Sequence, residues 1–443
     1  MSHVFPRSSA SSLPTIAKGE GVYLIDTNGK RYIDGSSGPA TSCLGHSDQA
    51  VTEAIKNQLD QVAFAHTGFF TSNAAENLAD KLIEHAPPGL EKVYFVSGGS
   101  EAVEASLKLA RQYFVEIGQP DRRFIIARRQ SYHGNTLGAL ATGGNKPRRR
   151  AFAPLLRDTI HISPCYEYRE KNQTESSYEY GQRTADELEA EIQKAGAENV
   201  MAFVAEPVVG ATAGALPPVD GYFKRIREIC DKYGILLILD EVMCGMGRTG
   251  TLFACEQDDI APDITAIAKG LGGGYQPIGA MLCSGKIYQA ITNGSGFFQH
   301  GHTYMGHPAA CAGSLAVLKR LTDDGLIDQA KKMGEKLNTS LIERFGQHPN
   351  IGDIRGRGLF RALEIVQDRE SKTPFPPELK IHKKIKSAAF EAGLLCYPNG
   401  GTVNGVIGDH VLIAPPFIIN DNHIEEITSK LETALKTALK NRS

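Results

Sequence analysis

The sequence predicts an α/β protein whose larger domain is a mostly parallel β-sheet with helices on both faces. Short apolar runs recur from about residue 70 to residue 320, and segments with helical periodicity separate them. The runs expected to be strands are Lys92–Val96, Phe124–Ala127, Met201–Ala205, Ile235–Leu239 and Ile264–Ala268. A strand that is apolar along its whole length is buried on both faces, as in parallel sheets covered by helices.

The two ends of the chain predict a second, smaller domain. Residues 326–443 alternate helices with short strands, a pattern typical of an α+β domain. Residues 1–65 contain a hairpin signal at Thr27-Asn28-Gly29, and we expect this N-terminal segment to contribute to the small domain. Residues 66–325 then form the large domain.

Composition and charge narrow the class of protein. The chain has 443 residues and a formal net charge of −2, which gives no argument for a nucleic-acid or anionic membrane partner. Its eight cysteines are scattered without a CxxC pair, so neither a metal site nor a disulfide framework is indicated. We expect reduced thiols, a cytoplasmic location and no membrane span. The basic run Lys146–Arg150 is interpreted as a solvated loop or, alternatively, as a rim that attracts an anionic substrate.

Unusual residues follow the expected strands, and ligands of parallel sheets bind outside the carboxyl ends of strands. Ser97-Gly98-Gly99-Ser100 follows the first strand and opens a helix, so its backbone N–H groups can receive an anion. The alternative is an ordinary helix cap by Ser97 or Ser100. No Lys-Ser or Lys-Thr follows the glycines, so a nucleotide P-loop is not supported.

Two further strand ends carry candidate site residues. Tyr132 and His133 follow the second strand on a glycine-bearing turn, where they form either a cofactor platform or ordinary loop packing. Glu206 ends the Met201–Ala205 strand ahead of a proline, and its carboxylate is either functional or a plain cap.

Asp240 and Lys269 are the most informative pair. Asp240 is the last residue of the most apolar expected strand. Lys269 directly follows the next expected strand and precedes a glycine-rich turn. A buried aspartate needs a cationic partner. That partner is either a protonated pyridine nitrogen, with the lysine amine forming a Schiff base, or an arginine in a structural salt bridge.

Together these segments resemble the class III aminotransferases over nearly the whole chain. The matching segments are GVYLIDTNGKRYID at 21–34, SGGSEAVEASLKLAR at 97–111, SYHG at 131–134, AEPV at 205–208, ILDEV at 238–242, AKGLGGGYQPIGA at 268–280, GHTYMGHPAACA at 301–312 and Ala414-Pro415-Pro416. The resemblance implies the pyridoxal-phosphate transferase fold of type I, with a seven-stranded sheet in the large domain, and pyridoxal 5'-phosphate as the cofactor.

The resemblance also implies a role for each matching residue. Lys269 would form the internal aldimine and move the proton at the substrate α-carbon, while Asp240 would pair with the pyridine nitrogen. Val242 and Tyr132 would pack on opposite faces of the cofactor ring. His133 would contact the residues that bind the cofactor without touching the cofactor itself.

The phosphate and the subunit arrangement complete the implied site. Gly99 and Ser100 would hold the phosphate at the helix N-terminus, and Glu206 would lie near the ring-oxygen side. Thr303 would reach the phosphate of the neighbouring subunit. A homodimer with shared active sites, or a tetramer built from such dimers, is therefore expected, and no metal is.

One departure from the family pattern concerns the substrate. Many members carry an arginine two residues before Ala-Pro-Pro, which binds a substrate carboxylate, whereas this chain has Leu412 and no arginine between Arg369 and Arg442. We therefore expect an ω-amine or ω-amino acid as donor and a keto acid such as pyruvate as acceptor, through ping-pong half-reactions. The candidate wall residues are Phe69, Phe70, Tyr166 and Phe297, and the candidate cations for the acceptor are Arg148–Arg150, Arg357 and Arg361.

Other functions remain open at the level of sequence. The same fold hosts a pyridoxal-phosphate decarboxylase, racemases, a mutase and lyases. A non-catalytic binding relative is the alternative from a different class, and the presence of Lys269 with Asp240 argues against it. A nicotinamide dehydrogenase is weaker, because the glycines after Lys269 lack G-x-G-x-x-G spacing.

Overall fold

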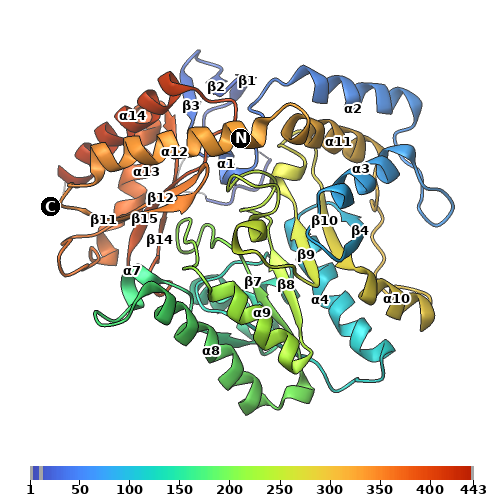
Figure 1. Cartoon of the computed structure of the whole chain (residues 1–443). Helices are drawn as coiled ribbons and strands as arrows, with labels where there is room; N and C mark the ends of the chain where they lie inside the picture. Colours follow the sequence, from blue (N-terminus) through green and yellow to red (C-terminus); the bar gives the residue numbers. More distant parts are fainter. Residues whose placement is uncertain (1–2, 9–12, 441–443) are drawn as a thin grey trace.

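A seven-stranded sheet forms the centre of the molecule in the computed structural model, which describes residues 3–8 and 13–440 (Figure 1). Its strand order is β4-β10-β9-β8-β7-β5-β6. The bounds are β4 Leu90–Val96, β5 Phe124–Arg128, β6 Ile160–Ile162, β7 Val200–Ala205, β8 Leu236–Asp240, β9 Ile264–Ile267 and β10 Gly279–Ser284. The pairs among β9, β8, β7, β5 and β6 are parallel, whereas β10 is antiparallel to both of its neighbours. The predicted α/β class and mostly parallel sheet are confirmed.

Helices cover both faces of this sheet because successive strand residues point to opposite sides. In β7, Phe203 and Ala205 pack with one cluster of buried residues, and Ala202 and Val204 pack with another. The first cluster includes α3, α8, α9 and α11, and the second includes α4 and α10. The helix bounds are α2 Gln49–Gln61, α3 Asn73–Glu84, α4 Gly99–Glu116, α5 Leu137–Thr142, α8 Ser177–Ala195, α9 Tyr222–Tyr233, α10 Gly285–Asn293 and α11 Pro308–Thr322.

The C-terminal part contains a four-stranded antiparallel sheet in the order β11-β12-β15-β14, covered by helices. A second four-stranded sheet, β1-β2-β3-β13, joins the N-terminal hairpin to the C-terminal part through the parallel pair β3 and β13. The bounds are β1 Ile16–Glu20, β2 Tyr23–Asp26, β3 Arg31–Asp34, β11 Ile351–Arg357, β12 Phe360–Ile365, β13 Leu394–Leu395, β14 Tyr397–Gly400, β15 Asp409–Ile413, α12 Leu326–Phe345, α13 Ile381–Glu391 and α14 Asp421–Lys440. The domain boundaries at residues 65 and 325 stay a prediction.

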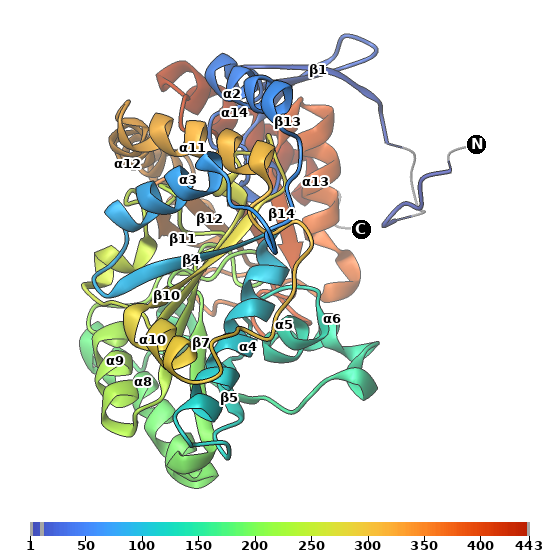
Figure 2. The same ribbon diagram turned by 90° about the vertical axis from the view of Figure 1, so that its right-hand side faces the viewer.

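The basic run that the sequence suggested to be a loop is a short helix, α6 Lys146–Arg150. The side chain of Asn145 accepts a hydrogen bond from the backbone N–H of Arg148, so the helix has a cap that a charge-based interpretation overlooked. Figure 2 shows α6 at an edge of the molecule, away from the centre of the seven-stranded sheet. Two other short helices are α1 Ser37–Ala40 and α7 Glu167–Glu170.

All eight cysteines carry free thiols, and seven of them are buried. Burial raises the pKa of Cys43 to about 11, which keeps this thiol protonated near neutral pH. Within residues 3–8 and 13–440, no helix combines the length and apolar character needed to cross a membrane.

Candidate active site

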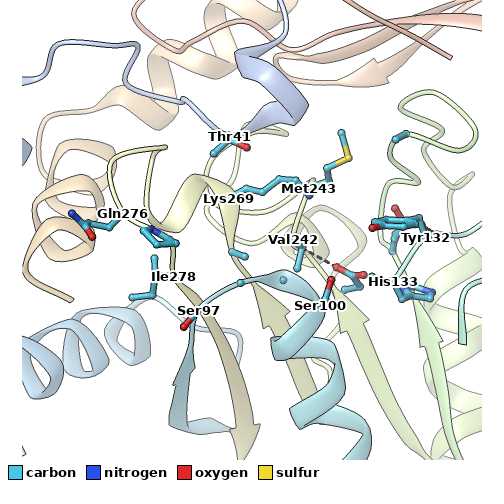
Figure 3. A pocket seen from close by; sticks show the side chains of 18 residues that line it. Thr41, Ser97, Ser100, Tyr132, His133, Val242, Met243, Lys269, Gln276 and Ile278 are labelled. Atoms are coloured by element: carbon cyan, nitrogen blue, oxygen red, sulfur yellow. Dashed lines mark hydrogen bonds and ion pairs between the residues drawn. The ribbon is translucent and has the colours of Figure 1, made fainter. Parts of the chain in front are cut away.

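A cavity of about 280 Å³ opens at the edge of the seven-stranded sheet where the parallel strands end (Figure 3). Segments after five strands line it, which is the position expected for a ligand site in such a sheet. Gln276-Pro277-Ile278 also line it, because β10 runs antiparallel and therefore begins at this edge. The residues that follow or end strands are Ser97–Ser100 after β4, Tyr132–Gly134 after β5, Glu206 after β7, Asp240, Val242 and Met243 at the end of β8, and Ala268-Lys269 after β9.

Asp240 is held by His133 rather than by an arginine. The Nδ1 atom of His133 lies 2.9 Å from Oδ2 of Asp240, and both side chains are buried. The backbone N–H of Val242 donates to Oδ1 of the same carboxylate at 3.0 Å. The Nε2 atom of His133 is buried and has no hydrogen-bond partner among the described residues. The arginine salt bridge that the sequence left open is therefore not what the structure contains.

Lys269 begins a short 3-10 turn, Lys269–Leu271, directly after β9. Its φ of 47° lies in the left-handed region, an uncommon conformation for a residue with a side chain. Burial lowers the pKa of its amine, and the carboxylates of Asp240 and Glu206 oppose this effect. In the part of the chain that the structure describes, no hydrogen bond or ion pair holds its Nζ atom. The fold therefore presents an amine with a reduced pKa at the cavity, free to react.

Glu206 connects the ends of two strands. One carboxylate oxygen accepts the backbone N–H of Tyr132 at 3.1 Å, and the other accepts that of Gly210 at 2.8 Å. Burial raises the pKa of this carboxyl, with a further contribution from Asp240 and an opposing one from His133. The buried guanidinium of Arg128 donates to the backbone carbonyl of Glu206. These contacts fix the backbone that carries the Tyr132 ring.

The start of α4 faces the cavity without a side-chain cap. Its N-cap residue is Gly98, so the serine cap considered from the sequence does not form. The first N–H groups of a helix have no acceptor within it and form an anion-binding end. At Gly99, a Cβ would lie 2.6 Å from Cγ1 of Val242, so only glycine allows this approach. The hydroxyl of Ser100 accepts the backbone N–H of Asn135 at 3.0 Å, which ties the turn after β5 to the helix.

Several candidates from the sequence lie elsewhere. Tyr166 was considered as a wall residue, but it is fully buried and donates its hydroxyl to Glu364, far from the cavity lining. Arg357 forms a bidentate ion pair with Asp258. Arg361 donates to two backbone carbonyls and to Asn338.

The other aromatic candidates, and Thr303, lie outside this cavity on the exposed surface of the chain. Phe69, Phe70 and Phe297 are exposed, at 82%, 66% and 63% of their surface, and Thr303 is also exposed. Leu412 is fully buried in β15 and packs with Phe360 and Ala414.

Some lining residues were not found from the sequence. Thr41 comes from the N-terminal segment, and Ala211 and Met243 are apolar residues that follow β7 and β8. Thr41 follows a turn in which Ser37 and Ala40 have φ values of 51° and 64°, and no local sequence signal predicts that conformation. Among the described residues, no group of three or more His, Cys, Asp or Glu side chains could hold a metal ion.

Comparisons with known proteins agree with this geometry. The family model for class III aminotransferases matches residues 4–435. An uncharacterised aminotransferase of Schizosaccharomyces pombe is 45% identical, with 99% of this chain and 95% of the relative covered. A chloroplastic gamma aminobutyrate transaminase of Solanum lycopersicum is 37% identical over 95% of this chain and 80% of its own length. The omega transaminase of Pseudomonas jessenii in complex with PMP superposes with a TM-score of 0.93 at 33% identity, covering 99% and 97% of the two chains.

The fold and the strand-end site thus define a pyridoxal-phosphate-dependent transferase. The chain belongs to the class III aminotransferases, and its cofactor is pyridoxal phosphate. The residues present fit that cofactor. Asp240 is a buried carboxylate able to face a cationic ring nitrogen, Lys269 is an unpaired amine, and α4 offers free N–H groups to a phosphate.

Proposed function

We propose that this aminotransferase moves an amino group from an ω-amine or ω-amino acid to a keto acid such as pyruvate, in two half-reactions that share one site. The observation that carries the reaction type is the unpaired, low-pKa amine of Lys269 beside Asp240 in one cavity. The observation that favours a terminal amine is the cavity lining, where no arginine stands among the described residues. An α-amino acid carries a carboxylate on the reacting carbon and would need such a cation close by.

Each residue around the cavity then has a role. When bound, pyridoxal phosphate supplies a reactive aldehyde and an electron-withdrawing ring. Lys269 attaches the cofactor covalently, and Asp240 keeps the ring nitrogen protonated through its charge. Val242 packs against one face of the ring and Tyr132 against the other. The start of α4, at Gly99 and Ser100, binds the phosphate, and Glu206 and His133 hold Tyr132 and Asp240 in place.

Lys269 also carries the proton in the reaction. With the cofactor and a substrate amine bound, the Lys269 amine would be available at the substrate carbon. Its lowered pKa favours the neutral amine more than in an ordinary lysine, so it can accept a proton from that carbon and return one to a neighbouring atom. Because this base is on a rigid strand end, its position relative to the cavity is fixed.

The assembly that fits this site is a homodimer with shared active sites. Thr303 does not line its own chain's cavity, and it lies on an exposed segment close in sequence to Phe297 and Tyr304. Large apolar side chains gather among the exposed residues of two segments, which is unusual for a monomer surface. They are Phe64, Phe69, Phe70, Phe297 and Tyr304. A partner covering them would bring Thr303 to the phosphate of the other site.

A donor and acceptor panel on the holoenzyme tests the proposal. We expect terminal amines and ω-amino acids to convert pyruvate to alanine, with keto or aldehyde product in equal amount. Loss of carbon dioxide, racemised substrate or ammonia without transfer would indicate a decarboxylase, racemase or lyase instead. Activity confined to α-amino acids such as ornithine or glutamate would contradict the donor class.

A further inference from the structure

The acceptor half of the proposed reaction requires a positive charge that the cavity lining does not supply. A keto acid carries a carboxylate beside the reacting carbon, and burying that charge without a cation is costly. Lys269 is engaged in the chemistry, and it is the only lysine or arginine among the described residues that line the cavity. A cation just beyond this lining, in this chain or in its partner, would meet this need.

Arg148 stacks on a residue of this lining. Its guanidinium carbon is 4.6 Å from the centroid of the Tyr132 ring, and Tyr132 lines the cavity. In the described part of the chain no carboxylate pairs with this guanidinium, and the side chain of Asn145 accepts the backbone N–H of Arg148. A cation on an aromatic face is held weakly, by about 0.5 to 1 kcal/mol at an exposed site, so a carboxylate can attract it away.

The fold holds the helix of Arg148 against the 401–408 loop, which precedes the strand where Leu412 stands in place of the expected arginine. Pro147 packs on Gly405, where an added Cβ would lie 2.7 Å from the proline Cδ. Gln130 joins the same segment to the turn before Tyr132, because its side-chain amide donates to the carbonyls of Gly401 and Thr402 at 2.7 and 3.0 Å. The 401–408 loop thus contributes packing, and α6 contributes the charge.

The other basic candidates are committed elsewhere. Arg357 is paired with Asp258, and Arg361 is bonded to backbone carbonyls and Asn338. Arg149 lies near His161 of β6, whose pKa is lowered by burial and, to a smaller degree, by the Arg149 charge. Arg150 is exposed.

We propose that Arg148, stacked on Tyr132 at the cavity edge, binds the carboxylate of the keto-acid acceptor. This inference rests on the proposed function and adds its specificity residue. An unpaired arginine also suits a site that takes two kinds of substrate in turn. It turns to the carboxylate when a keto acid enters and stays on Tyr132 when an amine without a carboxylate is bound. No rearrangement of the backbone is required.

The test compares two acceptors that differ mainly in a carboxylate, pyruvate and propanal, on holoenzyme variants. Arg148→Ala should raise KM for pyruvate by about 10- to 100-fold, the loss expected for one charged hydrogen-bonded contact. KM for propanal should stay near the wild-type value. Arg148→Lys should restore part of the pyruvate affinity, because lysine supplies the charge without the planar fork. Lys146→Ala, which removes an exposed charge from the same helix, is the matched control.

A second readout does not depend on turnover of pyruvate. Propionate should inhibit the half-reaction of a carboxylate-free amine, followed as a change in cofactor absorbance, and Arg148→Ala should weaken that inhibition as much as it raises KM for pyruvate. Equal losses with propanal and pyruvate, or unchanged inhibition by propionate, would overturn the role of Arg148. So would an equal effect of Lys146→Ala. If propionate changes the cofactor absorbance of the wild-type holoenzyme but not that of Arg148→Ala, while neither transfers an amine, the proposed function fails and this inference stands.

Discussion

His133 holds Asp240 through a buried contact of 2.9 Å between Nδ1 and Oδ2, and this pair stands behind the cavity that Lys269 enters from the neighbouring strand. The Asp240 carboxylate is thus oriented by His133, in the turn that follows β5, and by the backbone N–H of Val242. These two contacts fix the position of the carboxylate. Such preorganisation is how a site makes a fixed charge effective.

Replacing His133 tests that positioning. His133→Ala leaves Asp240 with one hydrogen bond fewer and an adjacent gap, so we expect kcat to fall roughly 10- to 100-fold, as is common when a residue supporting a ligand is lost. The absorbance of the bound cofactor should also change its pH dependence, because the charge of Asp240 on the ring is less well fixed. His133→Asn, which can still donate to the carboxylate, should recover part of both. An unchanged spectrum with normal kcat would contradict the assigned role.

Gly99→Ala tests the close approach of α4 to Val242. The new Cβ would meet Cγ1 of Val242 at 2.6 Å, so either the helix start or the valine must move. We expect weaker cofactor binding, measured by titrating the apoenzyme, and little change in the melting temperature of the apoenzyme. Combining Gly99→Ala with Val242→Ala removes the clash and should restore part of the affinity. Lower affinity in the double variant than in either single one would show that another contact decides the effect.

The buried amine of Lys269 predicts a pH-dependent stability of the apoenzyme. Its pKa is lowered from 10.5 in the folded state, so the charged form is destabilising there. This destabilisation is fully present below the folded-state pKa and disappears as the pH rises to 10.5, where the unfolded chain also loses the proton. Lys269→Met should therefore raise the melting temperature of the apoenzyme near neutral pH, and the gain should shrink in alkali. A gain that is constant with pH would instead reflect packing alone.

A complementation experiment tests the shared active site. Thr303→Asp places a negative charge where the partner's phosphate is proposed to lie, so the variant should lose cofactor and activity. Lys269→Ala is inactive for a different reason. Mixing the two and allowing subunits to exchange should restore up to about a quarter of wild-type activity, since half of the dimers then contain one intact site. No recovery after proven exchange would place Thr303 in its own chain's site or in none.

The sequence predicted charged site residues better than it predicted strands and strand order. Asp240, Glu206 and Lys269 could be identified because a charged residue at the end of an apolar strand is costly and therefore informative, and the structure gathers all three at one cavity. The mostly parallel sheet was predicted, but the order of its strands was not. The strand β11 was missed because Ile351–Arg357 is rich in glycine and charge, and its apolar contacts come from pairing with β12.

Residues proposed for the site because of their side-chain type, and not because they follow a strand, were predicted less accurately. Tyr166 was a candidate wall residue because it is aromatic, yet it is buried beside Arg355 and Glu364 in a network that only the tertiary fold brings together. Phe69 and Phe297 are exposed in a single chain, so their surroundings depend on a surface that one sequence does not describe. Arg148 was one of three adjacent arginines, and only the turn of α6 distinguishes it from Arg149 and Arg150.

The central claim is that Lys269 holds the cofactor and exchanges it with a terminal amine. The most direct measurement is borohydride reduction of the holoenzyme followed by peptide mass analysis, before and after addition of an ω-amine in the absence of acceptor. The account predicts a phosphopyridoxyl mass on Lys269 before addition and its loss afterwards, with regain when pyruvate is supplied. A label on another residue, or a label on Lys269 that an amine donor never removes, would contradict it.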